Sequence, residues 1–111
     1  ECKTDGLSLL WGPGNDIVST TNLACAGATL ILFTTGRGTP LGAPVPTLKI
    51  STNSELYEKK KDWIDFDAGE VLNGKGFDEL SKDLLKKICI LKTTGIILSK
   101  CSEVWHFVKH I

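Results

Sequence analysis

The chain has 111 residues, of which 41% are hydrophobic and 23% are charged, and these proportions are typical of one soluble globular domain. Thirteen lysine and arginine residues balance thirteen aspartate and glutamate residues, so the formal net charge is zero. This balance removes the electrostatic case for a nucleic acid or an acidic membrane as partner. No apolar run approaches the roughly 20 residues that cross a bilayer, and the N-terminus does not read as a signal peptide.

The ends and the cysteines add two expectations. The sequence begins at Glu1 and contains no methionine, so we expect a fragment of a longer polypeptide. Cys2, Cys25, Cys89 and Cys101 form no C-x-x-C pair. Reduced thiols of a cytoplasmic protein are the plainest interpretation, with zinc binding and disulfides as alternatives.

The N-terminal quarter predicts a strand and then a helix. Residues 7–11 are largely apolar, and we expect them to form a short strand. A break rich in glycine and proline follows, in which Asn15 or Asp16 is the natural N-cap of a helix. The helix is expected over roughly residues 17–26, and Gly27 is expected to end it.

The next segment contains the loop around which the chain is organised. Residues 29–33 are apolar without alternation, which predicts a strand covered on both faces of an α/β sheet. Residues 34–46 hold three glycines, three prolines, three threonines and one arginine, Arg37, and this composition predicts a loop. A guanidinium beside exposed backbone N–H groups suits a carboxylate or a phosphate, so we expect an anion-binding loop.

The second half predicts a third strand and two further helices. Residues 47–51 form the expected strand, and a short polar helix runs from a cap near Asn53 to about Lys60. The lysine triplet 59–61 is interpreted as a solvated face or helix end, with a basic recognition patch as the alternative.

A turn over residues 73–76 precedes an amphipathic helix over residues 77–93, which Gly95 is expected to end. The tail over residues 104–111 reads as an edge strand or an irregular arm. The apolar stripe of the long helix consists of Phe77, Leu80, Leu84, Leu85, Ile88 and Leu91.

This order of elements predicts an α/β domain with a small three-layer, mostly parallel sheet and helices on both faces. If the first three strands are parallel, their carboxyl ends share one edge, where open α/β sheets bind ligands. Residues 12–16, 34–44 and 51–54 would lie along that edge. The connection between the second and third strands has about a dozen residues without a clear helix, so a parallel crossover is barely long enough.

Two pairs of residues are candidate metal ligands. Asp65 and Asp67 share one side of an extended segment and suit a hard cation, although such pairs are also commonly solvated. His106 and His110 are four residues apart, which suits a metal pair on a helix, but the local pattern reads as extended.

Several motifs resemble one family. Residues 13–16 (PGND), 33–42 (FTTGRGTPLG) and 45–53 (VPTLKISTN) are similar to the C-terminal part of the altronate dehydratase/galactarate dehydratase family. Residues 63–69 (WIDFDAG) strengthen the match, which is closest to the altronate branch. The resemblance runs from about residue 6 to about residue 90. It implies the terminal domain of a longer enzyme whose remainder is its partner.

The resemblance also implies an activity. Members of the family are hydro-lyases that remove water from a hexonate or hexarate to give a 2-keto-3-deoxy acid, usually with iron (Fe2+) as the metal. We therefore expect a cytoplasmic enzyme of hexuronate degradation that is inactive as an isolated domain, and a homo-oligomer is possible. Sulfolactate sulfo-lyases share the family, so this domain does not fix the leaving group.

Dehydration of a 2,3-dihydroxy acid removes the C2 proton and expels the C3 hydroxyl, so the enzyme must hold the carboxylate and stabilise enediolate charge. We expect Arg37 to bind the carboxylate and Lys49 to supply charge or act as a base. Further substrate contacts are expected from Thr34, Thr35, Gly36, Gly38, Thr39, Asn53, Asn15 and Asp16.

Alternatives stay open at this point. For Arg37 they are pairing with a carboxylate of the domain or only stabilising the loop, and for Lys49 a position facing solvent on an edge strand. For Gly36, Gly38 and Gly42 the alternative is that they only allow turns. The whole domain is alternatively a non-catalytic assembly unit of the same enzyme, or an independent anion-binding module.

Overall fold

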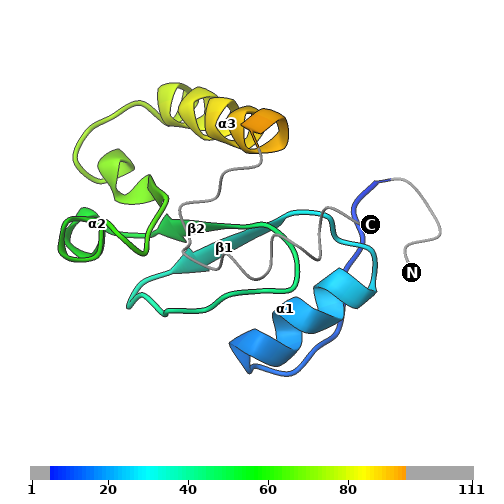
Figure 1. The fold of residues 1–111 in the computed structure, drawn as a ribbon. Helices are drawn as coiled ribbons and strands as arrows, with labels where there is room; N and C mark the ends of the chain where they lie inside the picture. The colour runs from blue at the N-terminus through cyan, green and yellow to red at the C-terminus, as the bar shows by residue number, and fades with distance from the viewer. Residues whose placement is uncertain (1–5, 95–111) are drawn as a thin grey trace. The chain divides into compact units, whose positions relative to one another are not determined.

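The computed structural model describes residues 6–94 (Figure 1). Within this range, no helix has the length and apolar character needed to span a bilayer. The described elements are, in order, α1 (Asp16–Cys25), β1 (Ile31–Thr35), β2 (Thr47–Ser51), α2 (Ser54–Lys59), β3 (Phe66–Asp67), the 3₁₀ helix η1 (Ala68–Val71) and α3 (Phe77–Thr94).

The described residues divide into two compact units. The first comprises residues 6–31 and 41–47 and contains α1. The second comprises residues 32–40 and 48–94 and contains most of the sheet together with α2, η1 and α3.

The three strands form one sheet in the order β1-β2-β3, so β2 is the central strand. β2 and β3 are parallel, with Ile50 opposite Phe66 and Ser51 opposite Asp67. Together with the helices, this sheet confirms the predicted α/β class with a parallel sheet.

β1 and β2 are adjacent parallel strands joined without a helix. The N–H of Ile31 donates to the carbonyl of Pro46 at one end, and the N–H of Thr52 donates to Thr35 at the other. A five-residue strand that rises about 3.3 Å per residue is about 17 Å long, and residues 36–46 must run back over this distance. An extended segment with that many residues is long enough to do so. The parallel crossover, for which the sequence predicted a connection that is barely long enough, is therefore present.

β2 is buried at all five positions, and its two faces differ in chemistry. Because successive side chains alternate, Leu48 and Ile50 share one face, and Thr47, Lys49 and Ser51 share the other. The apolar face packs against α3, the helix that lies over β2 in Figure 1. The core there consists of Leu48, Ile50, Phe66 and Leu80, with Ala68, Val71, Leu84, Ile88 and Leu91 packed against it.

The predicted stripe of α3 is confirmed at four positions and wrong at two. Phe77 and Leu85 are 74% and 60% exposed. Leu85 lies one residue beyond Leu84, a rotation of about 100° away from the core. Phe77 lies one turn before Leu80, the first residue of α3 in the core.

The helix caps confirm much of the predicted pattern. The side chain of Asn15 accepts from Ile17 N and Val18 N at the start of α1, and Asn53 accepts from Leu56 N at the start of α2. Gly27 follows α1 with a φ of +107°, the left-handed conformation that glycine adopts without strain.

One strand prediction is wrong, and a second is confirmed with other bounds and less burial than expected. Residues 7–11 form no strand, and Leu7 and Trp11 are 94% and 99% exposed. An apolar run becomes a strand only beside an edge that accepts its hydrogen bonds, and within residues 6–94 this run joins no sheet. The strand expected at residues 29–33 is β1, shifted by two residues, and it is an edge strand in which Leu32 is 46% exposed rather than covered on both faces.

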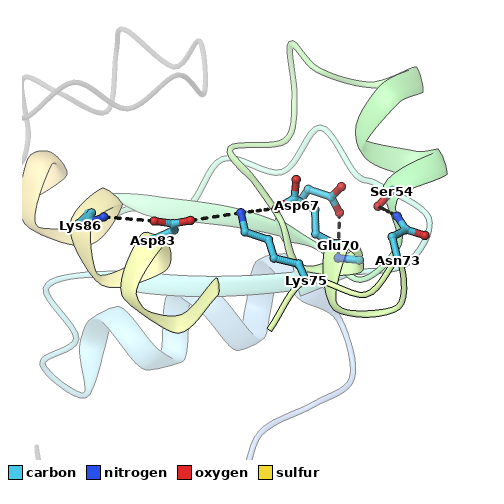
Figure 2. A network of polar contacts seen from close by, with 8 residues as sticks. Ser54, Asp67, Glu70, Asn73, Lys75, Asp83 and Lys86 are labelled. Carbon is cyan, nitrogen blue, oxygen red and sulfur yellow. Dashed lines mark hydrogen bonds and ion pairs between the residues drawn. The ribbon is translucent and has the colours of Figure 1, made fainter. Parts of the chain in front are cut away.

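The turn over residues 73–76 is confirmed and is joined by polar contacts to α3 and α2 (Figure 2). Lys75 Nζ lies 2.8 Å from Glu70 and 3.2 Å from Asp83 of α3, and these hydrogen bonds raise the pKa of Lys75 to about 12. Asn73 Nδ2 donates to Ser54 Oγ of α2 at 2.9 Å. The turn therefore links three parts of the second unit.

Several predictions lie outside the described residues. They concern the helix end at Gly95, the tail over residues 104–111, the pair His106 and His110, and the thiols of Cys2 and Cys101. Cys25 and Cys89 are exposed thiols.

We expect Gly69→Ala to destabilise the fold by about 3 kcal/mol, because overpacking against backbone has little room to relax. A Cβ on Gly69 would lie 2.4 Å from Ser54 N and 2.6 Å from Asn53 Cα. Urea denaturation measures the loss. Gly14→Ala is the matched control, since a Cβ there meets nothing within 4 Å. Equal stability of the two variants would contradict this packing.

Candidate anion-binding site

Residues 36–40, which we call the Arg37 loop, follow β1, and their backbone is held by donors from β2, from the residues between β2 and α2, and from the C-cap of α2. Four carbonyls over residues 35–39 accept hydrogen bonds from these donors. Thr35 O accepts from Thr52 N at 3.1 Å, Gly36 O from Asn53 Nδ2 at 3.2 Å, Arg37 O from Lys60 Nζ at 3.1 Å, and Thr39 O from Lys49 Nζ at 2.9 Å. Two of the four donors are ammonium groups, whose hydrogen bonds are stronger than neutral ones.

Gly38 makes the tight turn of the loop possible. Its φ is +76°, and its N–H donates to Thr35 Oγ1 at 2.9 Å. A Cβ at this position would lie 2.9 Å from Lys60 Cδ and 3.0 Å from Leu56 Cδ1. Glycine therefore serves both the left-handed conformation and the close approach of α2.

Arg37 is the only arginine of the chain, and its side chain is exposed at the tip of this loop. Within residues 6–94 its guanidinium makes no hydrogen bond or ion pair, so the alternative of a carboxylate partner is not found in that part of the chain. A planar fork on a fixed backbone suits bidentate binding of a carboxylate or phosphate.

Lys49 lies on the polar face of β2 and is only 3% exposed, so the alternative of a solvent-facing lysine on an edge strand is wrong. Its Nζ donates to Thr39 O, and its backbone N–H donates to Asp65 Oδ2 at 2.8 Å. The carbonyl of Asp65 in turn accepts from Lys87 Nζ of α3. Lys49 thus connects the Arg37 loop to a buried group of charges.

Burial raises the pKa of the Asp65 carboxyl above its ordinary value of 3.8. The hydrogen bond from Lys49 N and the charges of Lys87 and Lys49 act in the opposite direction, but burial is the larger effect. Asp65 as a whole is 4% exposed.

Asp65 and Asp67 do not fit a metal centre by themselves. Asp67 Oδ1 accepts from Gly69 N at 2.8 Å as the cap of η1, and Asp65 Oδ2 accepts from Lys49 N. Across residues 6–94, no three side chains of the His, Cys, Asp and Glu types gather where they could hold a metal ion.

The remaining predicted site residues fall into two groups. Thr34 is exposed on β1, and Asn53 uses Oδ1 to cap α2 and Nδ2 to hold Gly36. Asn15 and Asp16 belong to the first unit, where Asn15 caps α1 and Asp16 is exposed in its first turn. The second unit brings together Thr35, Gly36, Arg37, Gly38, Thr39, Lys49 and Asn53.

The contact of Lys60 with the Arg37 loop was not predicted from the sequence. Its neighbours Lys59 and Lys61 behave as the predicted solvated face, with exposed ion pairs to Glu55 and Glu58. Lys60 instead reaches the Arg37 loop. The sequence carries a signal for this difference, because the residues three and four before Lys60 are Tyr57 and Leu56 rather than glutamates.

These features define a small α/β domain with a cation-bearing loop at the carboxyl end of an edge strand. Residues 1–100 match the family described as D-galactarate/Altronate dehydratase, C-terminal, and the chain belongs to this family. The resemblance predicted from the loop motifs is thus confirmed.

Individual relatives support the same assignment. The altronate dehydratase of Escherichia coli (strain K12) is 57% identical over 86 residues, which cover 78% of this chain and 17% of that protein. The altronate dehydratase of Bacillus subtilis (strain 168) is 61% identical over 67 residues, 60% of this chain and 14% of that protein. The galactarate dehydratase (L-threo-forming) of Escherichia coli (strain K12) is 39% identical over 71 residues, 63% and 14% of the two chains. The chain spans less than a fifth of the length of these relatives.

We expect Asp65→Asn to change how stability depends on pH. A carboxyl whose pKa is raised on folding destabilises the folded state when ionised, and this cost is relieved as pH falls from the folded pKa towards 3.8. As pH falls from 7 to 4, the unfolding free energy of the wild type should therefore rise relative to that of the variant.

Urea denaturation across this pH range measures the shift, and Asp62→Asn, which removes an exposed carboxylate, is the comparison. A difference that stays flat or favours the Asp65→Asn variant at low pH would contradict the buried setting of this carboxyl.

Proposed function

We propose that this chain is the C-terminal domain of an altronate-type dehydratase, which removes water from a hexonate to give a 2-keto-3-deoxy acid. Membership of the dehydratase family and 57–61% identity to two altronate dehydratases support the assignment. Within that enzyme, the domain contributes the part of the active site that holds the substrate carboxylate.

The Arg37 loop carries this proposal. Its backbone is held by Lys49, Lys60 and Asn53, while the Arg37 guanidinium has no partner among residues 6–94. Because the backbone of Arg37 is already held, substrate binding has to order the side chain alone and not the loop as well, so more of the binding energy is retained. The planar fork then sets the orientation of the carboxylate, and with it the position of C2.

The reaction explains why such a contact helps catalysis. A base takes the proton from C2, the C3 hydroxyl leaves as water after protonation, and the resulting enol becomes the 2-keto-3-deoxy acid. As C2 loses its proton, negative charge spreads onto the carboxylate oxygens, which the guanidinium stabilises. The contact of Lys49 with Thr39 favours its predicted role as a fixed charge near the loop over that of a base.

The only basis for a metal in this proposal is the expectation, drawn from the family, that the enzyme uses iron(II). Iron(II) would polarise the substrate oxygens when bound. Because Asp65 and Asp67 already serve as structural acceptors, no step is assigned to a metal held by this chain. The base, the cytoplasmic location and a homo-oligomeric state stay predictions, as do the contacts of Thr34, Thr35 and Thr39 with substrate hydroxyls.

Substituting Arg37→Lys in a full-length dehydratase that contains this domain tests the proposal. Lysine keeps the charge but not the planar fork, so we expect kcat/KM for altronate to fall about 30-fold or more. Steady-state kinetics measure the change, with Lys61→Arg as a surface control of the reverse exchange. An unchanged kcat/KM would support the alternative of a non-catalytic assembly domain. Activity on sulfolactate instead of altronate would favour the sulfo-lyase relative.

A further inference from the structure

We infer that Lys60 is a positioning residue for Arg37, because its ammonium holds the Arg37 carbonyl and thereby sets the direction in which the Arg37 side chain leaves the loop. This inference rests on the proposed function, since it requires Arg37 to be the carboxylate ligand. Lys60 does not itself contact the substrate in this account.

The geometry at the end of α2 sends Lys60 towards the loop. Lys60 is the C-cap of α2, and its backbone N–H donates to Leu56 O at 3.0 Å and to Tyr57 O at 3.3 Å. Its side chain then turns away from the solvated face of Lys59 and Lys61. Nζ donates to the Arg37 carbonyl at 3.1 Å, across 23 residues of sequence.

Two further contacts restrict the side chain of Lys60. Nζ lies 5.0 Å from the centroid of the Trp63 ring, within the range of a cation–π interaction. Its stem runs over Gly38, where a Cβ would approach Lys60 Cδ to 2.9 Å and Nζ to 3.2 Å. The absence of a side chain at Gly38 thus gives the ammonium access to the neighbouring carbonyl.

Lys60 and Lys49 hold the loop in different settings. Lys49 is buried and joined to Asp65, so its removal would disturb the interior of the domain. Lys60 is half-buried, and its ammonium contacts the Arg37 carbonyl and the Trp63 ring. Its backbone makes hydrogen bonds to α2 and to residues 63 and 64. Lys60 can therefore be altered with less effect on the core than Lys49.

The test compares Lys60→Met with Lys59→Met and Lys61→Met in the full-length dehydratase. Methionine keeps an apolar stem over Gly38 but removes the donor and the charge. We expect Lys60→Met to raise KM for altronate about tenfold, with a smaller change in kcat, whereas the two controls match the wild type. Lys60→Arg, which retains a donor, should restore part of the affinity.

A double-mutant cycle with Arg37→Met separates positioning from general stability. If Lys60 acts through Arg37, Lys60→Met should have no further effect on KM in the Arg37→Met background, whatever its effect on the melting temperature. Additive effects, or a KM for Lys60→Met equal to that of the controls, would overturn the inference. If one of these outcomes is found while Arg37→Lys lowers kcat/KM in the same enzyme, the inference about Lys60 fails but the proposed function stands. If Arg37→Lys has no effect, the proposed function fails and this inference fails with it.

Discussion

The buried ammonium of Lys49 is the interaction on which the second unit of the domain depends. It lies on the central strand, where both faces are covered, and a charge in that position requires polar partners. The carbonyl of Thr39 is one such partner, and the neighbouring carboxylate of Asp65 accepts from the backbone of Lys49. The hydrogen bond from Lys49 to Thr39 joins the Arg37 loop to the polar face of β2.

The two faces of β2 therefore carry different functions. Leu48 and Ile50 build the hydrophobic core beneath α3, which stabilises the fold. The opposite face provides polar contacts to a loop that has neither helix nor strand of its own. Lys49 of β2 and Lys60 at the end of α2 donate to carbonyls of this loop. Of these two lysines and Arg37, it is Arg37 whose charged group stays open to solvent.

The sequence predicted the elements that local chemistry determines. The N-caps Asn15 and Asn53, the strand at residues 47–51 and most of the stripe of α3 follow from residue type and spacing. Prediction from the sequence failed for the segments whose structure depends on tertiary contacts. Residues 7–11 are apolar enough for a strand but join no sheet within the described part of the chain, and β1 became an edge strand.

The candidate site was predicted in part for the same reason. The glycines and Arg37 mark the loop directly, because few other structures accept that composition. Lys49 and Asn53 were correctly grouped with the loop, although their contacts are with its backbone carbonyls. The role of Lys60 depends on which side of α2 faces the loop, and the neighbouring lysines concealed it.

The most direct test of the central claim is a crystal structure of the full-length dehydratase with altronate bound. We predict that the substrate carboxylate accepts two hydrogen bonds from the Arg37 guanidinium, while Lys49 and Lys60 still bind the carbonyls of the loop. A structure in which altronate is bound elsewhere, with Arg37 paired to a carboxylate of the protein, would contradict the account.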